Sequence, residues 1–304
     1  MKEVLIIGGS GYVGKYVIER LTALRFSCVS VSRSVSASSR TIRKDLMDLH
    51  PKQNTLTKGF DAVVHLASNI QVDEFLQEPL QNFQNNVIST ANLIENMRIH
   101  NPKAPLIFLS SDKIYGAALS ERVMEDEIGK PLDPYGASKL CSELIIYSYA
   151  SAYGIPYIIL RSGTIFGPNQ QSRTFIPYLM SKIANKETLI KVGNMNVVRN
   201  FTYISDIVDA ITRSIMAKKT TNQVYNIVSF QAKIADVARK LALLAKDELG
   251  INIKFVHDTT RSRKSSVEPN QFTLDDSNSR RILRWKPRAR FDQSIEETFK
   301  SYLH

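Results

Sequence analysis

The sequence predicts an α/β protein built on a doubly wound parallel sheet, with a smaller C-terminal lobe. The chain opens on a short apolar run, Val4 to Ile7, that leads directly into a glycine-rich turn. Similar runs then alternate with helical spacings through the first half, as expected for a parallel sheet covered by helices on both faces. After Gly167-Pro168 the connections become longer and more polar, which predicts a second lobe.

Each element of the first half follows from its own pattern. Expected strands are apolar runs short enough to be buried on both faces, and expected helices carry apolar residues at intervals of three and four. Strands are expected at 4–7, 28–31, 62–66, 106–109 and 157–160, and helices at 12–24, 80–99 and 135–153. The stretch from Ser32 to Arg43 is rich in Ser and Arg and is interpreted as a loop.

The charge and composition of the chain limit the kinds of partner expected for it. The 304 residues carry a formal net charge of +11, but Lys and Arg are scattered, so a solvated basic surface is favoured over nucleic-acid binding. Cys28 and Cys141 are expected to be reduced thiols. No apolar run approaches the roughly 18 residues that span a bilayer, so membrane insertion is not expected. The N-terminus lacks a signal-peptide pattern, and a cytoplasmic protein is expected.

The glycines of the first turn predict a dinucleotide site. Gly8, Gly11 and Gly14 lie between a strand and a helix, and the helix opens with Tyr12 and Val13. Glycines at this spacing permit a tight turn, a close approach to a pyrophosphate and close helix-strand packing, while the helix N-terminus attracts the phosphates. We therefore expect residues 1–166 to form a Rossmann-like NAD(P)-binding domain, with a later segment near 196–228 returning to it. Residues 167–304 would form mainly the substrate-binding lobe, with a mobile loop at 256–270.

The end of the second expected strand bears on which dinucleotide binds. An acidic residue there would hold the adenosine ribose and repel a 2′-phosphate. This chain has Ser32 followed by Arg33, and no acid before Asp45. A guanidinium suits a phosphate monoester. The sequence therefore favours NADP, with NAD as the alternative.

Ser111, Tyr135 and Lys139 form a candidate acid-base set. Tyr135 and Lys139 are four residues apart on an expected helix, so they share one face. An ammonium about 4 Å from the phenol would lower the phenol pKa by about three units at an effective dielectric near 20. Ser111, at the end of an expected strand, can hydrogen-bond the reacting oxygen. The combination points to hydride chemistry on a carbonyl or carbinol.

With these motifs, the sequence closely resembles the extended short-chain dehydrogenase/reductase family, in its nucleotide-sugar epimerase/dehydratase branch. The resemblance covers essentially the whole chain. Besides the glycine loop and the Tyr135/Lys139 pair, it rests on Lys44-Asp45-Leu46, His65-Leu66-Ala67-Ser68, Asn86-Val87, Ser110-Ser111-Asp112-Lys113-Ile114-Tyr115-Gly116, Arg161, Gly167-Pro168, Arg199-Asn200-Phe201-Thr202-Tyr203-Ile204-Ser205-Asp206, Ile282-Leu283-Arg284-Trp285-Lys286-Pro287 and Ser294-Ile295-Glu296-Glu297-Thr298-Phe299.

The resemblance implies roles for further residues. Asp45 and Leu46 would lie by the adenine, and Ala67 along the cofactor. Tyr135 would be the acid/base, Ser111 a hydrogen-bond donor and Lys139 the support of both tyrosine and ribose. In the substrate site, Arg199 would contact the diphosphate, Phe175 would line the sugar-nucleotide site, and Lys113 would contact the sugar. A homodimer through helices 80–99 and 135–153 is also implied, and no metal site is expected.

The exact reaction is open between three members of this branch. The Ser32-Arg33 pair favours an NADPH-dependent reductase of a nucleotide-linked 4-keto-6-deoxysugar, with Tyr135 as general acid, and this is the first hypothesis. Asp112 could instead donate a proton during water elimination, as in 4,6-dehydratases. The alternative is therefore a nucleotide-sugar 4-epimerase or 4,6-dehydratase with retained NAD. A non-catalytic NADP-binding sensor is a remote alternative.

Overall fold

A seven-stranded parallel sheet forms the centre of the protein, which is described by a computed structural model. The structure describes residues 2–33, 40–70, 77–118, 120–127, 129–171, 174–217, 222–258 and 272–303. The strands, in spatial order, are β11 (Gln223–Ile227), β7 (Tyr157–Ser162), β5 (Leu106–Ser111), β4 (Ala62–His65), β1 (Glu3–Ile7), β2 (Ser27–Ser32) and β3 (Arg40–Arg43). All six pairings between them are parallel, which confirms the predicted fold class.

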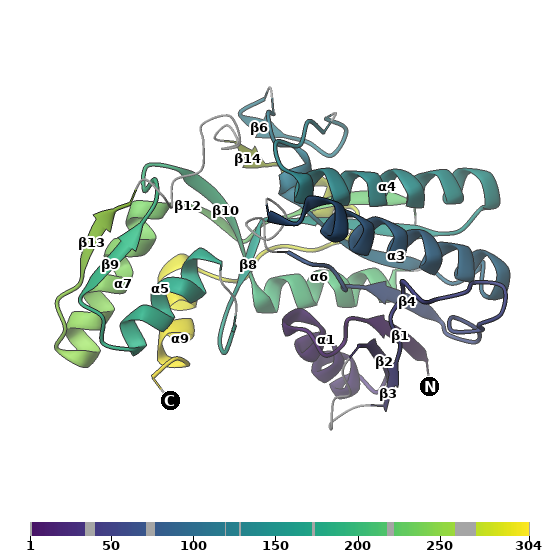
Figure 1. Cartoon of the computed structure of the whole chain (residues 1–304), viewed down its shortest axis with the longest axis horizontal. Coiled ribbons are helices and arrows are strands. Elements are labelled where there is room, and N and C mark those ends of the chain that lie inside the picture. Colours follow the sequence, from purple (N-terminus) through teal and green to yellow (C-terminus); the bar gives the residue numbers. More distant parts are fainter. Residues whose placement is uncertain are drawn as a thin grey trace.

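Two helix layers cover this sheet (Figure 1). The layers are α3 (Pro79–His100) with α4 (Pro134–Tyr153), and α1 (Tyr12–Ala23) with α6 (Ile204–Met216). Each strand contributes side chains to the packing against both helix layers, because successive side chains of a strand point to opposite faces of the sheet. In β1, Leu5 and Ile7 join the apolar cluster beneath α3 and α4, whereas Val4 and Ile6 join the cluster beneath α1 and α6.

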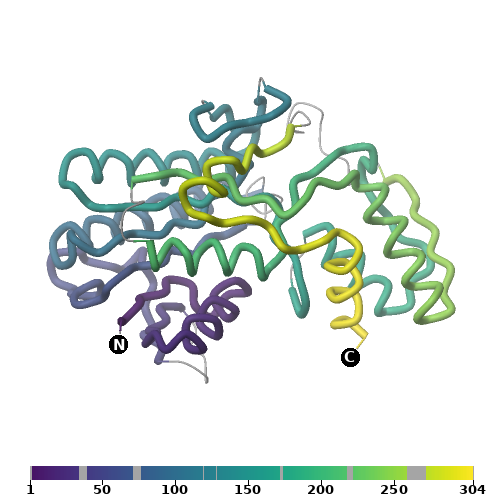
Figure 2. The backbone as a smooth tube through the Cα atoms, turned by 180° about the vertical axis from the view of Figure 1, so that it is seen from behind, coloured from purple at the N-terminus to yellow at the C-terminus, as the bar shows by residue number. Residues whose placement is uncertain are grey.

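The C-terminal lobe continues the second of these clusters. Its apolar residues, including Leu179, Leu241 and Trp285, belong to the same buried cluster as Val4 and Ile6. Figure 2 shows the last segment, in yellow, running from the top of the molecule across to this lobe. The remaining elements are η1 (Asp112–Ile114), β6 (Arg122–Val123), β8 (Thr164–Phe166), α5 (Phe175–Ala184), β9 (Leu189–Val192), β10 (Val198–Tyr203), β12 (Phe230–Lys233), α7 (Ile234–Leu249), β13 (Lys254–His257), β14 (Thr273–Leu274), α8 (Ser277–Arg281) and α9 (Phe291–Lys300).

Two expectations differ from the structure. The stretch interpreted as a loop contains strand β3, which pairs with β2 at the sheet edge. Its burial pattern is almost entirely exposed, so the apolar signal that marks the other strands is missing. The loop expected at 256–270 begins inside β13, and residues 259–271 lie outside the part that the structure describes.

The strand order reverses between β1 and β4, and this position marks the expected ligand site. From β1 the chain builds outward through β2 and β3 on one side and through β4, β5, β7 and β11 on the other. In such sheets ligands bind beyond the carboxyl ends of the strands at the reversal, because the two neighbouring loops separate there. Gly8 follows β1 and Ala67 lies just beyond β4, so both predicted cofactor residues lie at this position.

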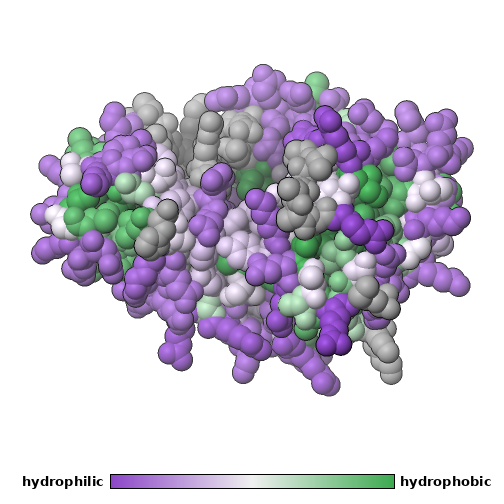
Figure 3. Space-filling view, turned by 90° about the horizontal axis from the view of Figure 1, so that it is seen from below, coloured by the Kyte–Doolittle hydropathy of each residue, from purple (hydrophilic) through white to green (hydrophobic). Residues whose placement is uncertain are grey.

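Figure 3 shows a largely hydrophilic face with small hydrophobic areas over both lobes. Within the described part of the chain, no helix combines the length and the apolar character needed to cross a bilayer.

Trp285 offers a test of how the C-terminal segment is held. Its side chain is completely buried, and its indole N–H donates to the Asp206 carbonyl at 2.9 Å. Trp285→Ala should lower the free energy of unfolding by about 3–5 kcal/mol in urea titrations, because it leaves a large cavity. The exposed Leu243 provides a control, since Leu243→Ala should change stability by about 0.5 kcal/mol or less. A loss below about 1 kcal/mol for Trp285→Ala would contradict this packing.

Candidate active site

The glycine turn forms a close-packed cradle at the N-terminus of α1. Gly8 has φ +87°, and a Cβ there would lie 2.7 Å from the Ala67 nitrogen. A Cβ on Gly14 would lie 2.4 Å from the Gly8 carbonyl oxygen, so the helix packs directly on the turn. Gly11 is the N-cap residue of α1, and it makes no side-chain hydrogen bond to the first backbone N–H groups of the helix. The cradle therefore fits the pyrophosphate of a dinucleotide.

The residues after Gly11 pack beneath the cradle. Val13 and Tyr12 are partly buried against the core cluster. The Tyr12 hydroxyl lies close to Gly167, where a Cβ would meet it at 2.7 Å. Burial raises the pKa of Tyr12, so its phenol is neutral. Tyr12 thus links the glycine turn to the point where the chain enters the second lobe.

The ends of β2 and β3 bring two arginines together. Ser32 is buried and pairs in register with Arg43, whose Nε donates to the Arg33 carbonyl at 3.2 Å. Arg33 itself is exposed. Asp45 follows β3, and the neighbouring Leu46 is buried beneath the same edge. This end of the sheet carries positive charge where an NAD-specific site would carry an acid.

Tyr135 lies in the first turn of α4. The helix begins there because Pro134 takes its first position and the Asp133 carboxylate caps it, accepting from the Gly136 N–H at 2.7 Å. Tyr135 is buried and shares a hydrogen bond with Ser111 at the end of β5. Burial raises the pKa of Tyr135, and the Ser111 hydrogen bond only partly offsets it.

Lys139 departs from the expected arrangement. Its Nζ donates to the Leu109 carbonyl at 2.9 Å and lies 4.7 Å from the Phe108 ring centre. Burial lowers the pKa of Lys139 to about 7, against the opposing charge of Glu143. Burial dominates the pKa of Tyr135 in this arrangement and raises it, so the expected lowering by the Lys139 ammonium is not found here.

A small pocket next to Ser111 collects three of the predicted residues. Asp112 and Lys113 reach it from η1, and Arg199 reaches it from β10 in the second lobe. Asp112 accepts from the Ser111 hydroxyl and from the Asn200 amide, both at 3.4 Å. Burial raises the pKa of Asp112, although the charge of Lys113 opposes this shift. Phe175 does not line this pocket and packs against the core of the second lobe.

The remaining wall of the pocket was missed by sequence reasoning. Phe272, Asn200, Thr164 and Val198 complete the lining. The Phe272 carbonyl accepts from Asn200 at 3.3 Å and from Gln231 at 2.8 Å. Asn200 directly follows Arg199 and could have been inferred from that motif, whereas no sequence signal identifies Phe272.

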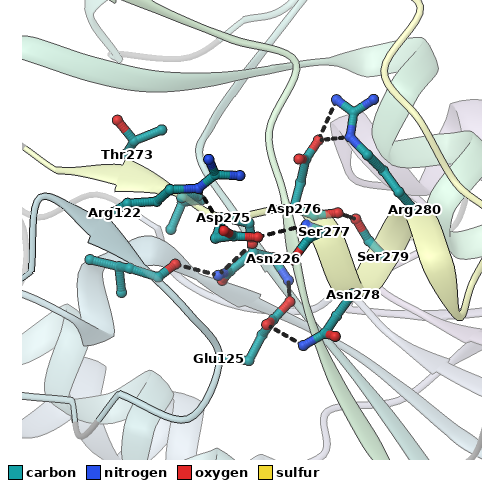
Figure 4. A network of polar contacts seen from close by, with 12 residues as sticks. Arg122, Glu125, Asn226, Thr273, Asp275, Asp276, Ser277, Asn278, Ser279 and Arg280 are labelled. Carbon is teal, nitrogen blue, oxygen red and sulfur yellow. Dashed lines mark hydrogen bonds and ion pairs between the residues drawn. The ribbon is translucent and has the colours of Figure 1, made fainter.

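A polar network fixes the segment after Phe272 against the first lobe (Figure 4). Arg122 pairs with Asp275 at 2.6 Å, and the Asn226 amide donates to the Asp275 carbonyl at 3.1 Å. The Glu125 carboxylate accepts from Asn278 at 2.8 Å. The pocket wall is therefore fastened to β6 and β11.

Among the described residues, no three His, Cys, Asp or Glu side chains are grouped to hold a metal ion.

Comparison with known proteins places the chain in a family. The profile described as the NAD dependent epimerase/dehydratase family matches residues 4–228, most of the chain. The chain belongs to this family. It is an enzyme of the extended short-chain dehydrogenase/reductase type, as the motifs predicted.

Individual relatives of this epimerase/dehydratase family are distant but extend over the whole chain. The human dTDP-D-glucose 4,6-dehydratase is 26% identical, over 99% of this chain and 90% of that protein. A trifunctional UDP-glucose 4,6-dehydratase/epimerase/reductase of Arabidopsis thaliana is 24% identical, and the chain spans only 47% of its length. The UDP-glucuronic acid 4-epimerase of Bacillus cereus, solved with UDP-glucuronic acid and NAD, has a TM-score of 0.86 at 23% identity, over 99% and 98% of the two chains.

The buried Lys139 predicts a specific dependence of stability on pH. The pKa of Lys139 is about 7 in the folded protein and 10.5 for an unburied lysine side chain. Between these two pH values, the unfolded chain therefore binds one proton more than the folded protein. The free energy of unfolding should rise from pH 7 to 8.5, by up to about 1.4 kcal/mol per pH unit. Lys139→Met should remove this rise in urea titrations, whereas Lys15→Met, at an exposed position of α1, should retain it. An unchanged slope in Lys139→Met would contradict the burial of the charge.

Proposed function

We propose that this protein is a nucleotide-sugar 4,6-dehydratase, in which Tyr135 starts oxidation at C4 and Asp112 supplies the proton for water loss. The observation that carries the proposal is the buried Asp112 beside Ser111, with its pKa raised. Burial that favours the protonated carboxylic acid suits the elimination step, because that step consumes a proton. The similarity to 4,6-dehydratases supports this choice over the reductase.

The first step is proton removal from the C4 hydroxyl. A nicotinamide bound in the Gly8–Gly14 cradle would accept the C4 hydride and later return it. Tyr135 is the base, Ser111 hydrogen-bonds the reacting oxygen, and Lys139 provides the positive charge that favours the phenolate. In this proposal the raised pKa of Tyr135 keeps the phenol protonated until a substrate and a cofactor change its surroundings.

The second step is elimination across C5 and C6 of the sugar. Once C4 is a ketone, the C5 proton is acidic, and Lys113, beside Asp112 in the pocket, would take it as the base. Asp112 protonates the C6 hydroxyl, which leaves as water. The hydride then returns to C6 and a proton to C5, so atoms and electrons balance within one substrate. Lys113 and Arg199, which line the pocket from opposite lobes, would hold the sugar and the diphosphate. The contact of Phe175 with the sugar nucleotide stays a prediction.

Two other reactions remain candidates, each for a specific reason. A 4-epimerase needs the same Tyr135 chemistry without an acid at C6, and the B. cereus epimerase shares the fold. The NADPH-dependent reductase is favoured by the two arginines at the ends of β2 and β3.

A homodimer through α3 and α4 is also proposed, because Leu80, Leu144 and Tyr147 of these helices are 58–70% exposed.

Substitution of the two acid-base residues separates these reactions. Tyr135→Phe should lower turnover of dTDP-glucose or UDP-glucose by about 10²–10⁴-fold, because proton removal at C4 fails. Asp112→Asn should still oxidise C4 but lose dehydration by a similar factor, measured as 6-deoxy product by mass spectrometry. Tyr147→Phe, at an exposed position on the same helix, is the control. Normal dehydration by Asp112→Asn would reject Asp112 as the acid, and epimer formation without water loss would indicate the epimerase.

Arg33 tests the cofactor preference separately. If its guanidinium binds a 2′-phosphate, Arg33→Ala should weaken NADP binding by about 10–100-fold, the loss of one charge-assisted hydrogen bond, and leave NAD binding within about twofold. Fluorescence titration of both cofactors measures this. Arg40→Ala is the matched control, since Arg40 pairs with Glu3 at 3.1 Å. Equal loss of both cofactors, or a wild-type preference for NAD, would contradict a 2′-phosphate site at Arg33.

A further inference from the structure

Three polar contacts join the catalytic helix α4 to the end of β5. Tyr135, Lys139 and Glu143 are spaced at four-residue intervals, so they share one helix face. Each contacts a different residue at the end of β5. Tyr135 shares a hydrogen bond with Ser111, Lys139 donates to the Leu109 carbonyl, and the Glu143 carboxylate accepts from the Ser110 hydroxyl.

Glu143 is itself held from a second strand. Arg161 of β7 donates to its carboxylate through Nη2 at 2.7 Å and through Nε at 3.1 Å. Both residues are buried, with 4% and 7% of their surface exposed. A bidentate pair of this kind fixes the geometry as well as the charge. Glu143 therefore connects α4 to β5 and β7 at one point.

Arg161 is anchored beyond this pair. Its Nη1 donates to the Tyr115 hydroxyl and to the Glu125 carbonyl, both at 2.8 Å. Tyr115 donates in turn to Asn226 of β11, and Asn226 and Glu125 belong to the network of Figure 4. The ion pair is thus fixed by the same residues that fasten the pocket wall.

Three elements supply the titratable and polar groups around Lys139, and among the groups named here only Glu143 is charged. On β4, burial lowers the pKa of His65 to about 3, with the charge of Lys139 acting in the same direction, so His65 is neutral. On β5, Lys139 meets the uncharged Leu109 carbonyl and the Phe108 ring. On α4, the charge of Glu143 opposes the desolvation of Lys139.

We infer that Glu143 is a positioning residue, which keeps α4 in register with β5 and supplies the negative charge that Lys139 faces. The inference rests on the proposed role of Tyr135 and Lys139 in the reaction. Loss of the carboxylate leaves Arg161 buried without its counter-charge, and this also disfavours a second cation nearby. The effect on catalysis would act through Lys139 on the proton transfer at Tyr135.

The test compares Glu143→Gln, which removes the charge, with Glu143→Asp, which keeps it. Nζ titration of Lys139 is followed by NMR of isotope-labelled lysine, with Lys139→Met used for assignment. Glu143→Gln should shift the Lys139 titration downward by about one pH unit, roughly a tenfold change in the protonation equilibrium, and Glu143→Asp should shift it by less than half as much. Glu95→Gln is the matched control, because Glu95 pairs with Arg98 at 2.7 Å on another helix.

A parallel activity measurement separates this inference from the proposed function. With sugar-nucleotide turnover, Glu143→Gln should move the alkaline limb of the kcat profile downward by about one pH unit, because the proposed step needs Lys139 protonated, with KM within about twofold. An unmoved Lys139 titration overturns the inference, even if the variant is less stable. Failure of the wild type to turn over sugar nucleotides would instead contradict the proposed function and leave the titration result valid. If Glu143→Gln does not fold, Ser110→Ala is measured instead. It should lower kcat without moving the limbs of the pH profile, and an unchanged kcat would overturn the role of Glu143 in keeping α4 in register with β5.

Discussion

Lys139 carries its ammonium group into the contact between α4 and β5, and burial there opposes its charge. Desolvation of this kind is tolerated only when polar groups replace the lost water. The Leu109 carbonyl and the charge of Glu143 supply that compensation. Because these contacts fix α4 against β5, they also set the position of Tyr135 relative to Ser111. The geometry of the proposed acid-base site is therefore a consequence of how one helix packs on one strand.

The parallel sheet determines where the other parts of the site lie. Strand ends at the reversal between β1 and β4 bring Gly8 next to Ala67, so the cofactor cradle forms at the same edge as Ser111. The second lobe adds Arg199 through β10, which joins β8 and β12 in a separate sheet. The pocket thus combines residues that are far apart in the sequence, and neither lobe alone completes it.

Local patterns were enough to predict most of the central fold and to propose the candidate acid-base set. Strands β1, β4, β5 and β7 are short apolar runs, and α4 carries Tyr135 and Lys139 at helical spacing. Strand β3 was missed because an exposed edge strand rich in polar residues has no apolar signal. Phe272 was missed because its place depends on hydrogen bonds from distant Asn200 and Gln231. The state of Lys139 could not be predicted, since spacing gives a shared face but not the depth of burial.

Transfer of the C4 hydrogen is the most direct measurement of the central claim. The protein would be incubated with UDP-glucose or dTDP-glucose carrying deuterium at C4, and the product analysed by NMR for the position of the label. The account predicts that the deuterium leaves C4 and is recovered at C6 of a 4-keto-6-deoxy product. Deuterium that returns to C4 with inverted configuration would show epimerisation instead. Retention of all label at C4 with unchanged configuration, in both substrates with NAD or NADP supplied, would contradict hydride chemistry at this carbon.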